Sequence, residues 1–146
     1  MRSFREYMEQ LKDSDEQDIA KTLERLPPAH RDLLRNCKLR LQGGNTLSGD
    51  QDNIGYWDRK NDRICVAAPW HYGREFTFLH EIGHQVWENL PQRIQAAWVK
   101  AVRSEDQIRS PEETFCMVYA NVYAKHKLQT FAMPHLERFV KRLEAL

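Results

Sequence analysis

Apolar and polar positions follow a strand pattern in one stretch of the chain and a helix pattern elsewhere. From Lys38 to Gln42 they alternate, with Leu39 and Leu41 set between polar neighbours. Two further apolar runs flank a polar turn at 58–62, an arrangement that indicates an antiparallel hairpin. We therefore predict a small antiparallel sheet within residues 38–67, with strands at 38–42, 54–57 and 63–67.

Helical spacing dominates the rest of the chain. Pro27-Pro28 ends a charged, helix-favouring stretch, and a short helix is expected at 29–36. After Gly73 the helical period returns. Helices are expected at 74–89, 91–103, 111–126 and from 134 to the C-terminus. The prediction is one α+β domain, with a helical N-terminal segment (1–36), the sheet (38–67), central helices (73–126) and a C-terminal helix (134–146).

Composition and charge exclude several classes of function. Lys and Arg number 22 against 21 Asp and Glu, so the net charge is +1 and there is no strong field to attract nucleic acid or anionic lipid. The three cysteines include no CxxC pair, which argues against a disulfide framework and against a cysteine zinc site. The first residues lack the apolar run of a signal peptide, which favours a cytoplasmic protein, with export by another route left open.

The segment His80-Glu81-Ile82-Gly83-His84 is an HExxH motif within one of the predicted helices. On a helix His80 and His84 are about 40° apart and one turn along the axis, so both imidazoles can reach one metal ion. Zinc suits this arrangement, with one ion per chain. Glu81 is turned about 100° from His80, which suits a general base acting on a metal-bound water better than a ligand.

The same helix has a predicted core face and a predicted contact point. Leu79, Ile82 and Val86 fall on the side opposite the histidines, where they would pack into the core. Gly83 lies beside the metal face, and a helical glycine costs about 1 kcal/mol relative to alanine. We therefore expect another helix to approach the backbone closely at Gly83.

A catalytic zinc ion needs a third protein ligand from elsewhere in the chain. Trp87 and Leu90 exclude the HExxHxxGxxH pattern, which leaves a glutamate on a second helix, and Glu113 is the best candidate. A zinc ion would compensate the cost of burying its carboxylate. The alternative is that Ser110 and Glu113 form only a capping box at the helix start. Glu112 is the reserve candidate for the ligand, and Cys116, one turn after Glu113, is expected to be a packing residue.

Two motifs, Phe78-Leu79-His80-Glu81-Ile82-Gly83-His84 and Pro111-Glu112-Glu113-Thr114-Phe115-Cys116, resemble the anthrax lethal factor-like metallopeptidases, which include the Pro-Pro endopeptidases. The resemblance covers about residues 54–126. It implies a zincin-like α+β domain, zinc held by His80, His84 and Glu113, and hydrolysis of a peptide bond.

The chain departs from this family at two positions. Cys116 and Met117 stand where the family usually has Ala and Glu, and Asp106 stands where the family has a tyrosine that stabilises the developing oxyanion. Four residues are candidates to replace that tyrosine: Tyr119, Tyr123, Arg109 and His71.

The predicted function is zinc-dependent hydrolysis of a peptide or protein substrate by a metal-activated water. The substrate is expected to lie extended beside the strand at 63–67. A zinc-stabilised binding or regulatory module without catalysis is one alternative. A protease of the kind that cleaves prophage repressors is another, and it would differ in substrate rather than in chemistry.

Overall fold

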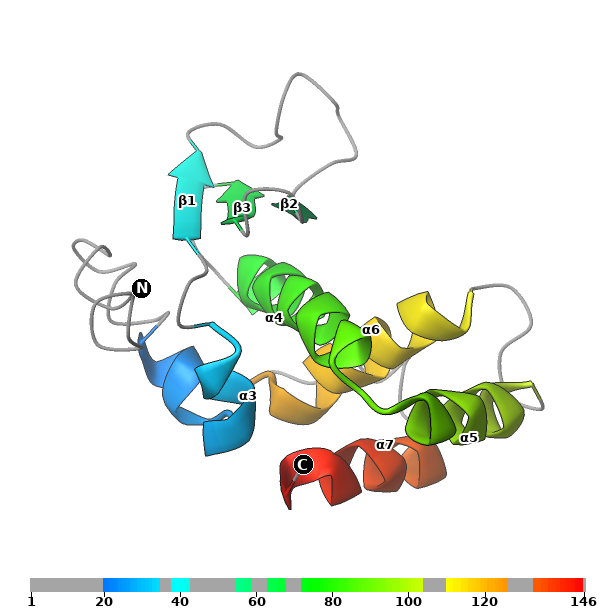
Figure 1. Cartoon of the computed structure of the whole chain (residues 1–146). Helices are drawn as coiled ribbons and strands as arrows, with labels where there is room; N and C mark the ends of the chain where they lie inside the picture. The colour runs from blue at the N-terminus through cyan, green and yellow to red at the C-terminus, as the bar shows by residue number, and fades with distance from the viewer. Residues whose placement is uncertain are drawn as a thin grey trace.

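The computed structural model describes residues 20–34, 38–42, 55–58, 63–67, 72–103, 110–125 and 133–145, with side chains at 20–34, 75–103, 110–125 and 133–144. A helical turn at 20–24 precedes the named elements. In chain order these are α3 (Pro28–Asp32), β1 (Lys38–Gln42), β2 (Gly55–Asp58), β3 (Arg63–Ala67), α4 (Tyr72–Glu88), α5 (Gln92–Val102), α6 (Pro111–Tyr123), α7 (Pro134–Lys141) and the 3-10 helix η2 (Arg142–Ala145) (Figure 1). Most of the N-terminal segment predicted to be helical, residues 1–19, lies outside the described residues.

The three strands form a mixed sheet in the order β1, β3, β2. β2 pairs antiparallel with β3, but β1 pairs parallel with it, so that Lys38 lies opposite Arg63. All residues whose side chains are described lie in helices or in the segments next to them. The prediction of an α+β fold with a small antiparallel sheet is therefore wrong. Alternation along one strand carries no information about the direction of its partner, and the partner of β1 is β3, which comes after β2 in the sequence.

The position of β3 also overturns the prediction about substrate. The sequence predicts a free edge at 63–67 for an extended peptide, but β3 is the central strand, paired with β1 on one side and with β2 on the other. Its backbone hydrogen bonds are already used within the sheet. Among the described strands, β1 and β2 are the ones with an outer edge.

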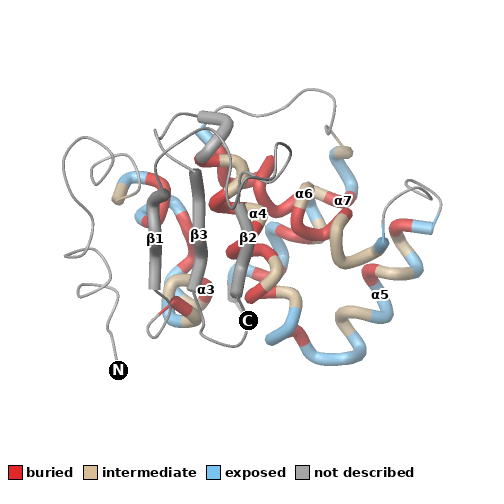
Figure 2. Tube along the Cα trace, turned by 90° about the horizontal axis from the view of Figure 1, so that it is seen from above, coloured by how far each residue is buried: buried red, intermediate tan, exposed pale blue. Residues whose placement is uncertain are grey.

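The centre of the fold is the contact between α4 and α6, which cross each other below the sheet (Figure 1). α4 also contacts β2 and β3. Leu79, Ile82 and Val86 are buried, as predicted for the core face of α4. α6 is buried along almost its whole length (Figure 2). Because α6 is buried on more than one side, its sequence is apolar around most of the helix, as in Phe-Cys-Met-Val-Tyr-Ala, and has no amphipathic pattern.

The remaining helices close the lower side of this core. Trp98 of α5 packs edge-on against Phe115 of α6, with ring centroids 5.3 Å apart, and against Phe139 of α7 at 5.2 Å. Leu136 and Val140 of α7 are fully buried, so the last helix packs into the core. None of the helices in the described part of the chain is long and apolar enough to cross a lipid bilayer.

A buried carboxylate joins the N-terminal part of the chain to α4 and α6. Glu75 accepts hydrogen bonds from the hydroxyl of Thr22 at 3.0 Å and from the backbone N–H of Lys125 at 2.6 Å. Arg25 lies 2.9 Å from the same carboxylate. Because Glu75 is only 6% exposed, these partners offset the cost of burying its charge.

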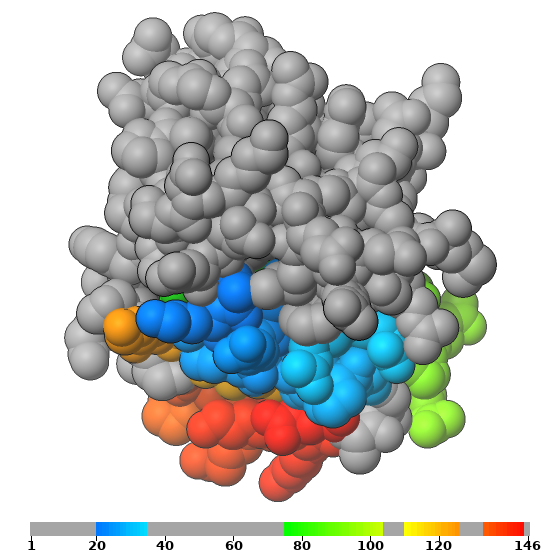
Figure 3. Space-filling model, turned by 90° about the vertical axis from the view of Figure 1, so that its left-hand side faces the viewer, coloured from blue at the N-terminus to red at the C-terminus, as the bar shows by residue number. Residues whose placement is uncertain are grey.

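A second buried polar link holds α3 to α6 and to the C-terminus. Residues 20–34 lie directly against the C-terminal helices (Figure 3). Nε2 of His30 is 3.3 Å from the carbonyl of Leu143, which can only accept, so Nε2 carries the proton. Nδ1 then accepts from the hydroxyl of Tyr119 at 3.0 Å. Burial lowers the pKa of His30, although the backbone hydrogen bond to Leu143 opposes the shift.

Candidate metal centre

α4 presents His80 and His84 on one face, one helical turn apart, as the motif predicts. Their ring centroids are 5.1 Å apart, and their side chains are only 15% and 11% exposed. The helix continues to Glu88 and ends where the side-chain amide of Asn89 donates to the carbonyl of Gln85 at 2.8 Å. Pro91 then begins the turn into α5. The histidines therefore lie inside a regular helix, where their spacing is fixed.

The first turn of α6 carries Glu112 and Glu113 to this face. Ser110 is the N-cap, and its hydroxyl accepts from the backbone N–H of Glu113 at 3.2 Å. The indole N–H of Trp98 donates to the carbonyl of Pro111 at 2.8 Å and ties the same turn to α5. The helix start is thus held from two directions.

Gly83 sets how closely α4 and α6 approach. A Cβ built on Gly83 would lie 3.0 Å from the Cα of Cys116, 3.3 Å from its Cβ and 3.4 Å from its Sγ. Distances this short leave no room for a side chain. The prediction that a second helix lies against Gly83 is confirmed, and that helix is α6, the one that carries Glu113.

The carboxylate of Glu113 lies against both imidazoles. Its Oε2 is 3.0 Å from Nε2 of His80, and its Oε1 is 3.2 Å from Nε2 of His84. Ser110 caps the backbone N–H of Glu113, but the Glu113 side chain lies at the histidines, so only the Ser110 half of the capping box is formed. The side chain is 47% exposed, so its carboxylate is less buried than the sequence suggests. Glu112 lies on the other edge of His84, with Oε1 3.4 Å from Nδ1.

These distances match the donor separations of a zinc site. Zinc binds imidazole nitrogen and carboxylate oxygen at about 2.1 Å in tetrahedral geometry, which places two such donors about 3.4 Å apart. The two separations to Nε2 atoms, 3.0 and 3.2 Å, fall short of this value by a few tenths of an ångström. Two neutral imidazoles with one carboxylate are also a donor set that catalytic zinc sites use. The residues present fit a zinc ion.

The electrostatics of the site favour a neutral His80. Burial lowers its pKa, which the nearby carboxylate of Glu113 partly offsets and the second imidazole reinforces. A metal ligand must offer an unprotonated nitrogen. The environment of His80 thus moves it toward the form that binds metal.

Cys116, a packing residue in the sequence interpretation, is also a potential donor. It is fully buried, and its Sγ lies with one nitrogen each of His80 and His84 in a group whose atoms are all within 4.8 Å of one another. The signal in the sequence is its spacing, one helical turn after Glu113. The two histidines can therefore be joined by either of two third donors, the carboxylate of Glu113 or the thiol of Cys116.

The remaining predicted site residues have mixed outcomes. Glu81 is buried, with 7% exposure, next to the ligand face of α4. The hydroxyls of Tyr119 and Tyr123 contact His30 and Glu144, and Tyr119 is fully buried, so neither phenol is placed to meet a substrate at the histidines. The other two candidates for oxyanion stabilisation, Arg109 and His71, lie outside the described residues.

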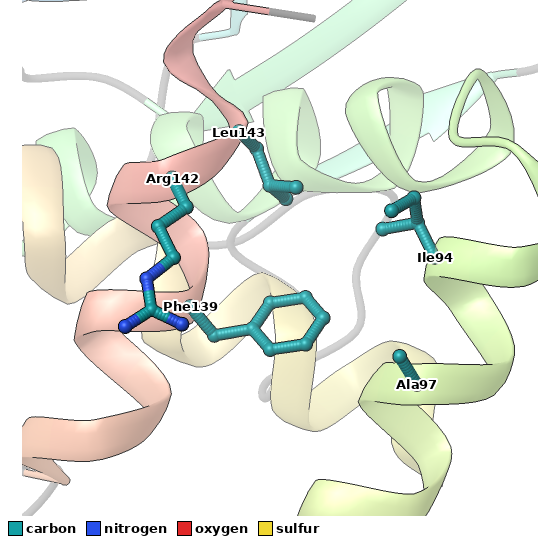
Figure 4. Close-up of a pocket in the computed structure, with 5 residues that line it drawn as sticks. All are labelled: Ile94, Ala97, Phe139, Arg142 and Leu143. Atoms are coloured by element: carbon teal, nitrogen blue, oxygen red, sulfur yellow. The ribbon is translucent and has the colours of Figure 1, made fainter.

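An apolar hollow elsewhere in the molecule has no chemical groups suited to the predicted reaction. It encloses about 230 Å³ between α5 and the C-terminal helices, and its lining is Ile94, Ala97, Phe139, Arg142 and Leu143 (Figure 4). Arg142 is the only charged residue among them. The hollow and the histidine cluster are therefore separate features.

Comparison with protein-family models, curated proteins and solved structures gives no match for this chain. The resemblance to the lethal factor-like metallopeptidases accordingly stays a prediction. Any functional conclusion depends on the residues and their geometry.

Proposed function

We propose that this chain is a zinc-dependent peptidase that uses His80, His84 and Glu113 as metal ligands and Glu81 as general base. The observation that carries the proposal is the convergence of one carboxylate on two imidazole Nε2 atoms, at 3.0 and 3.2 Å, from a helix that packs against Gly83 of the HExxH motif. Sequence separation makes this convergence informative, because Glu113 is distant from the motif along the chain.

Each residue has a distinct part in the proposed reaction. When bound, the zinc ion would polarise the scissile carbonyl and lower the pKa of a bound water. Glu81 would accept a proton from that water and pass it to the leaving amine. Its place in the sequence supports this part, because Glu81 directly follows the ligand His80 on α4. Glu113 and the histidines would hold the ion, and the carboxylate of Glu113 would neutralise its charge in part.

The test separates zinc binding from catalysis. Glu81→Gln should keep one zinc ion per chain, measured by metal analysis, and lose cleavage of a random peptide library by at least about a hundredfold. Glu88→Gln removes the same charge from an exposed position on the same helix and should cleave like the wild type. Undiminished cleavage by Glu81→Gln, or a wild-type protein that binds no zinc, would refute the proposal.

A second candidate is a closed zinc site without catalysis, and the position of Cys116 favours it. A thiolate from Cys116 together with His80, His84 and Glu113 would fill all four tetrahedral positions and leave none for water. Cobalt(II) in place of zinc distinguishes the two states. A thiolate-to-cobalt charge-transfer band that Cys116→Ser abolishes indicates the closed site, and its absence in the wild type indicates the open one.

A further inference from the structure

The two ring nitrogens of His84 face different carboxylates. Nε2 lies 3.2 Å from Oε1 of Glu113, whereas Nδ1 lies 3.4 Å from Oε1 of Glu112. Nδ1 is buried, and among the described residues it has no hydrogen-bond partner of acceptable geometry. A buried ring nitrogen in this state needs an explanation, because buried polar atoms are normally satisfied.

We propose that Glu112 is a positioning residue that accepts a hydrogen bond from Nδ1–H of His84 when His84 binds zinc through Nε2. This inference rests on the proposed function, since it concerns the metal-bound form. A neutral imidazole has one ring proton, so a metal ion on Nε2 places that proton on Nδ1. The buried N–H then requires an acceptor, and the carboxylate of Glu112, with Oε1 at 3.4 Å, would have to come closer and into line with the N–H bond.

The helix geometry explains why adjacent glutamates do different things. Glu112 and Glu113 differ by about 100° around α6, so their carboxylates reach opposite edges of the same imidazole rather than one atom. Both lie in the first turn of α6, where the exposed backbone N–H groups favour negative charge. The helix start can therefore hold two carboxylates side by side without a cation on each.

The same geometry favours Glu113 over Glu112 as the third metal ligand. Glu113 lies within 4 Å of both histidines, whereas of these two rings Glu112 lies within 4 Å of His84 alone, and on the nitrogen turned away from Glu113. One imidazole cannot bind a single ion through both nitrogens. Glu112 is consequently placed to orient His84 and raise its basicity, and Glu113 to bind the metal.

Zinc affinity, measured by competition with a chromophoric chelator, tests this division. Glu112→Ala should weaken zinc binding about 10- to 100-fold, the usual effect of removing an outer partner of a metal-bound histidine. Glu112→Gln keeps an acceptor oxygen and should weaken it less, whereas Glu113→Gln should weaken it most. Glu24→Gln, which removes one negative charge from an exposed site in the N-terminal turn, should match the wild type and serves as the charge control.

A second readout follows the ring proton itself. In the zinc-loaded wild type, long-range proton–nitrogen NMR should show His84 bound through Nε2, with a slowly exchanging Nδ1–H. In Glu112→Gln that proton should shift, and in Glu112→Ala it should exchange rapidly. If Glu112→Ala fails to fold, the Gln variant alone tests the shift and the intermediate affinity.

The outcomes separate the two proposals. Zinc binding by the wild type together with unchanged affinity and an unchanged ring proton in both Glu112 variants would overturn this inference and leave the proposed function standing. A larger loss in Glu112→Gln than in Glu113→Gln would also overturn it, because Glu112 would then be the ligand. A wild type that binds no zinc overturns both.

Discussion

Gly83→Ala is the substitution for which the structure gives the clearest expectation. The new methyl group would lie 3.0 Å from the Cα of Cys116 and 3.3 Å from its Cβ. The nearest atom belongs to the backbone of α6, so no side-chain rotation can relieve the clash. α4 and α6 would have to separate by a few tenths of an ångström to accommodate it.

Two effects on stability oppose each other. Alanine gains about 1 kcal/mol of helix propensity over glycine. Overpacking in a close-packed core costs about 1 to 3 kcal/mol. With a middle value for the second effect, we expect a net loss of about 1 kcal/mol in the free energy of unfolding, or a melting temperature lower by about 3 °C.

The larger effect should be on the metal site. Glu113 lies one helical turn before Cys116, so the separation of the helices moves its carboxylate away from His80 and His84. The displacement also turns the carboxylate relative to the two imidazoles, and a metal site tolerates only about 10 to 20° of such misorientation, so we expect zinc affinity to fall about tenfold. Chelator competition measures the affinity, and urea unfolding of the metal-free protein measures the stability.

A graded series makes this reasoning refutable. Gly83→Ser and Gly83→Val should weaken zinc binding progressively more than Gly83→Ala, because each adds bulk at the same point. A Gly83→Ala protein that is more stable than the wild type and binds zinc equally well would show that α6 can move away from Gly83 without disturbing the ligands, and would refute this reasoning.

Three further predictions concern the polar contacts that hold the helices. Stability should fall as the pH drops below about 6.5, because the pKa of His30 is lowered in the folded state and the unfolded chain therefore binds a proton first. Urea unfolding of the metal-free protein at pH 8 and pH 5.5 should show a smaller loss of stability at the lower pH in His30→Gln than in the wild type. An equal loss in both proteins would contradict this prediction. Glu75→Gln should lower the free energy of unfolding by about 2 kcal/mol, because the Arg25 guanidinium and the backbone N–H of Lys125 both lose a charged partner. A loss smaller than about 0.3 kcal/mol would contradict a stabilising role for these contacts. Trp98→Phe keeps an aromatic ring but removes the hydrogen-bond donor to the carbonyl of Pro111. The free energy of unfolding should fall by about 1 kcal/mol, and zinc affinity should fall a few-fold. Unchanged values of both would show that Trp98 does not hold the start of α6.

The local part of the site could be predicted from the sequence, because one helical period fixes it. The spacing of His80 and His84 determines which face they share, and the glycine between them marks the point where another helix comes close. The choice of Glu113 follows from asking which buried helix offers a carboxylate. In the structure these predictions appear as two Nε2–carboxylate distances and as the close approach of Gly83 to the backbone of Cys116.

Features that depend on partners distant in sequence were not predictable in this way. Alternation in 38–42 identifies a strand but not that it runs parallel to β3, and the central position of β3 follows only from the pairing of all three strands. Nothing in the sequence distinguishes Glu75 from an exposed charged residue in the first turn of a helix. It is buried because Thr22, Arg25 and the end of α6 surround it. Local pattern does not contain these contacts.

Core packing and metal geometry depend on the same helix crossing. Phe115 lies between Trp87 and Trp98, with centroids 5.4 and 5.3 Å away, and it immediately follows the turn that carries the two glutamates. Packing of Phe115 therefore fixes the position of α6 along α4, while Gly83 fixes the distance between the two helices. Because a close-packed core resists small displacements, the carboxylate of Glu113 is held near the imidazoles even without a metal ion. Zinc binding should then require little rearrangement of α4 and α6, so the metal-free protein should keep the helical circular dichroism spectrum of the zinc-bound form.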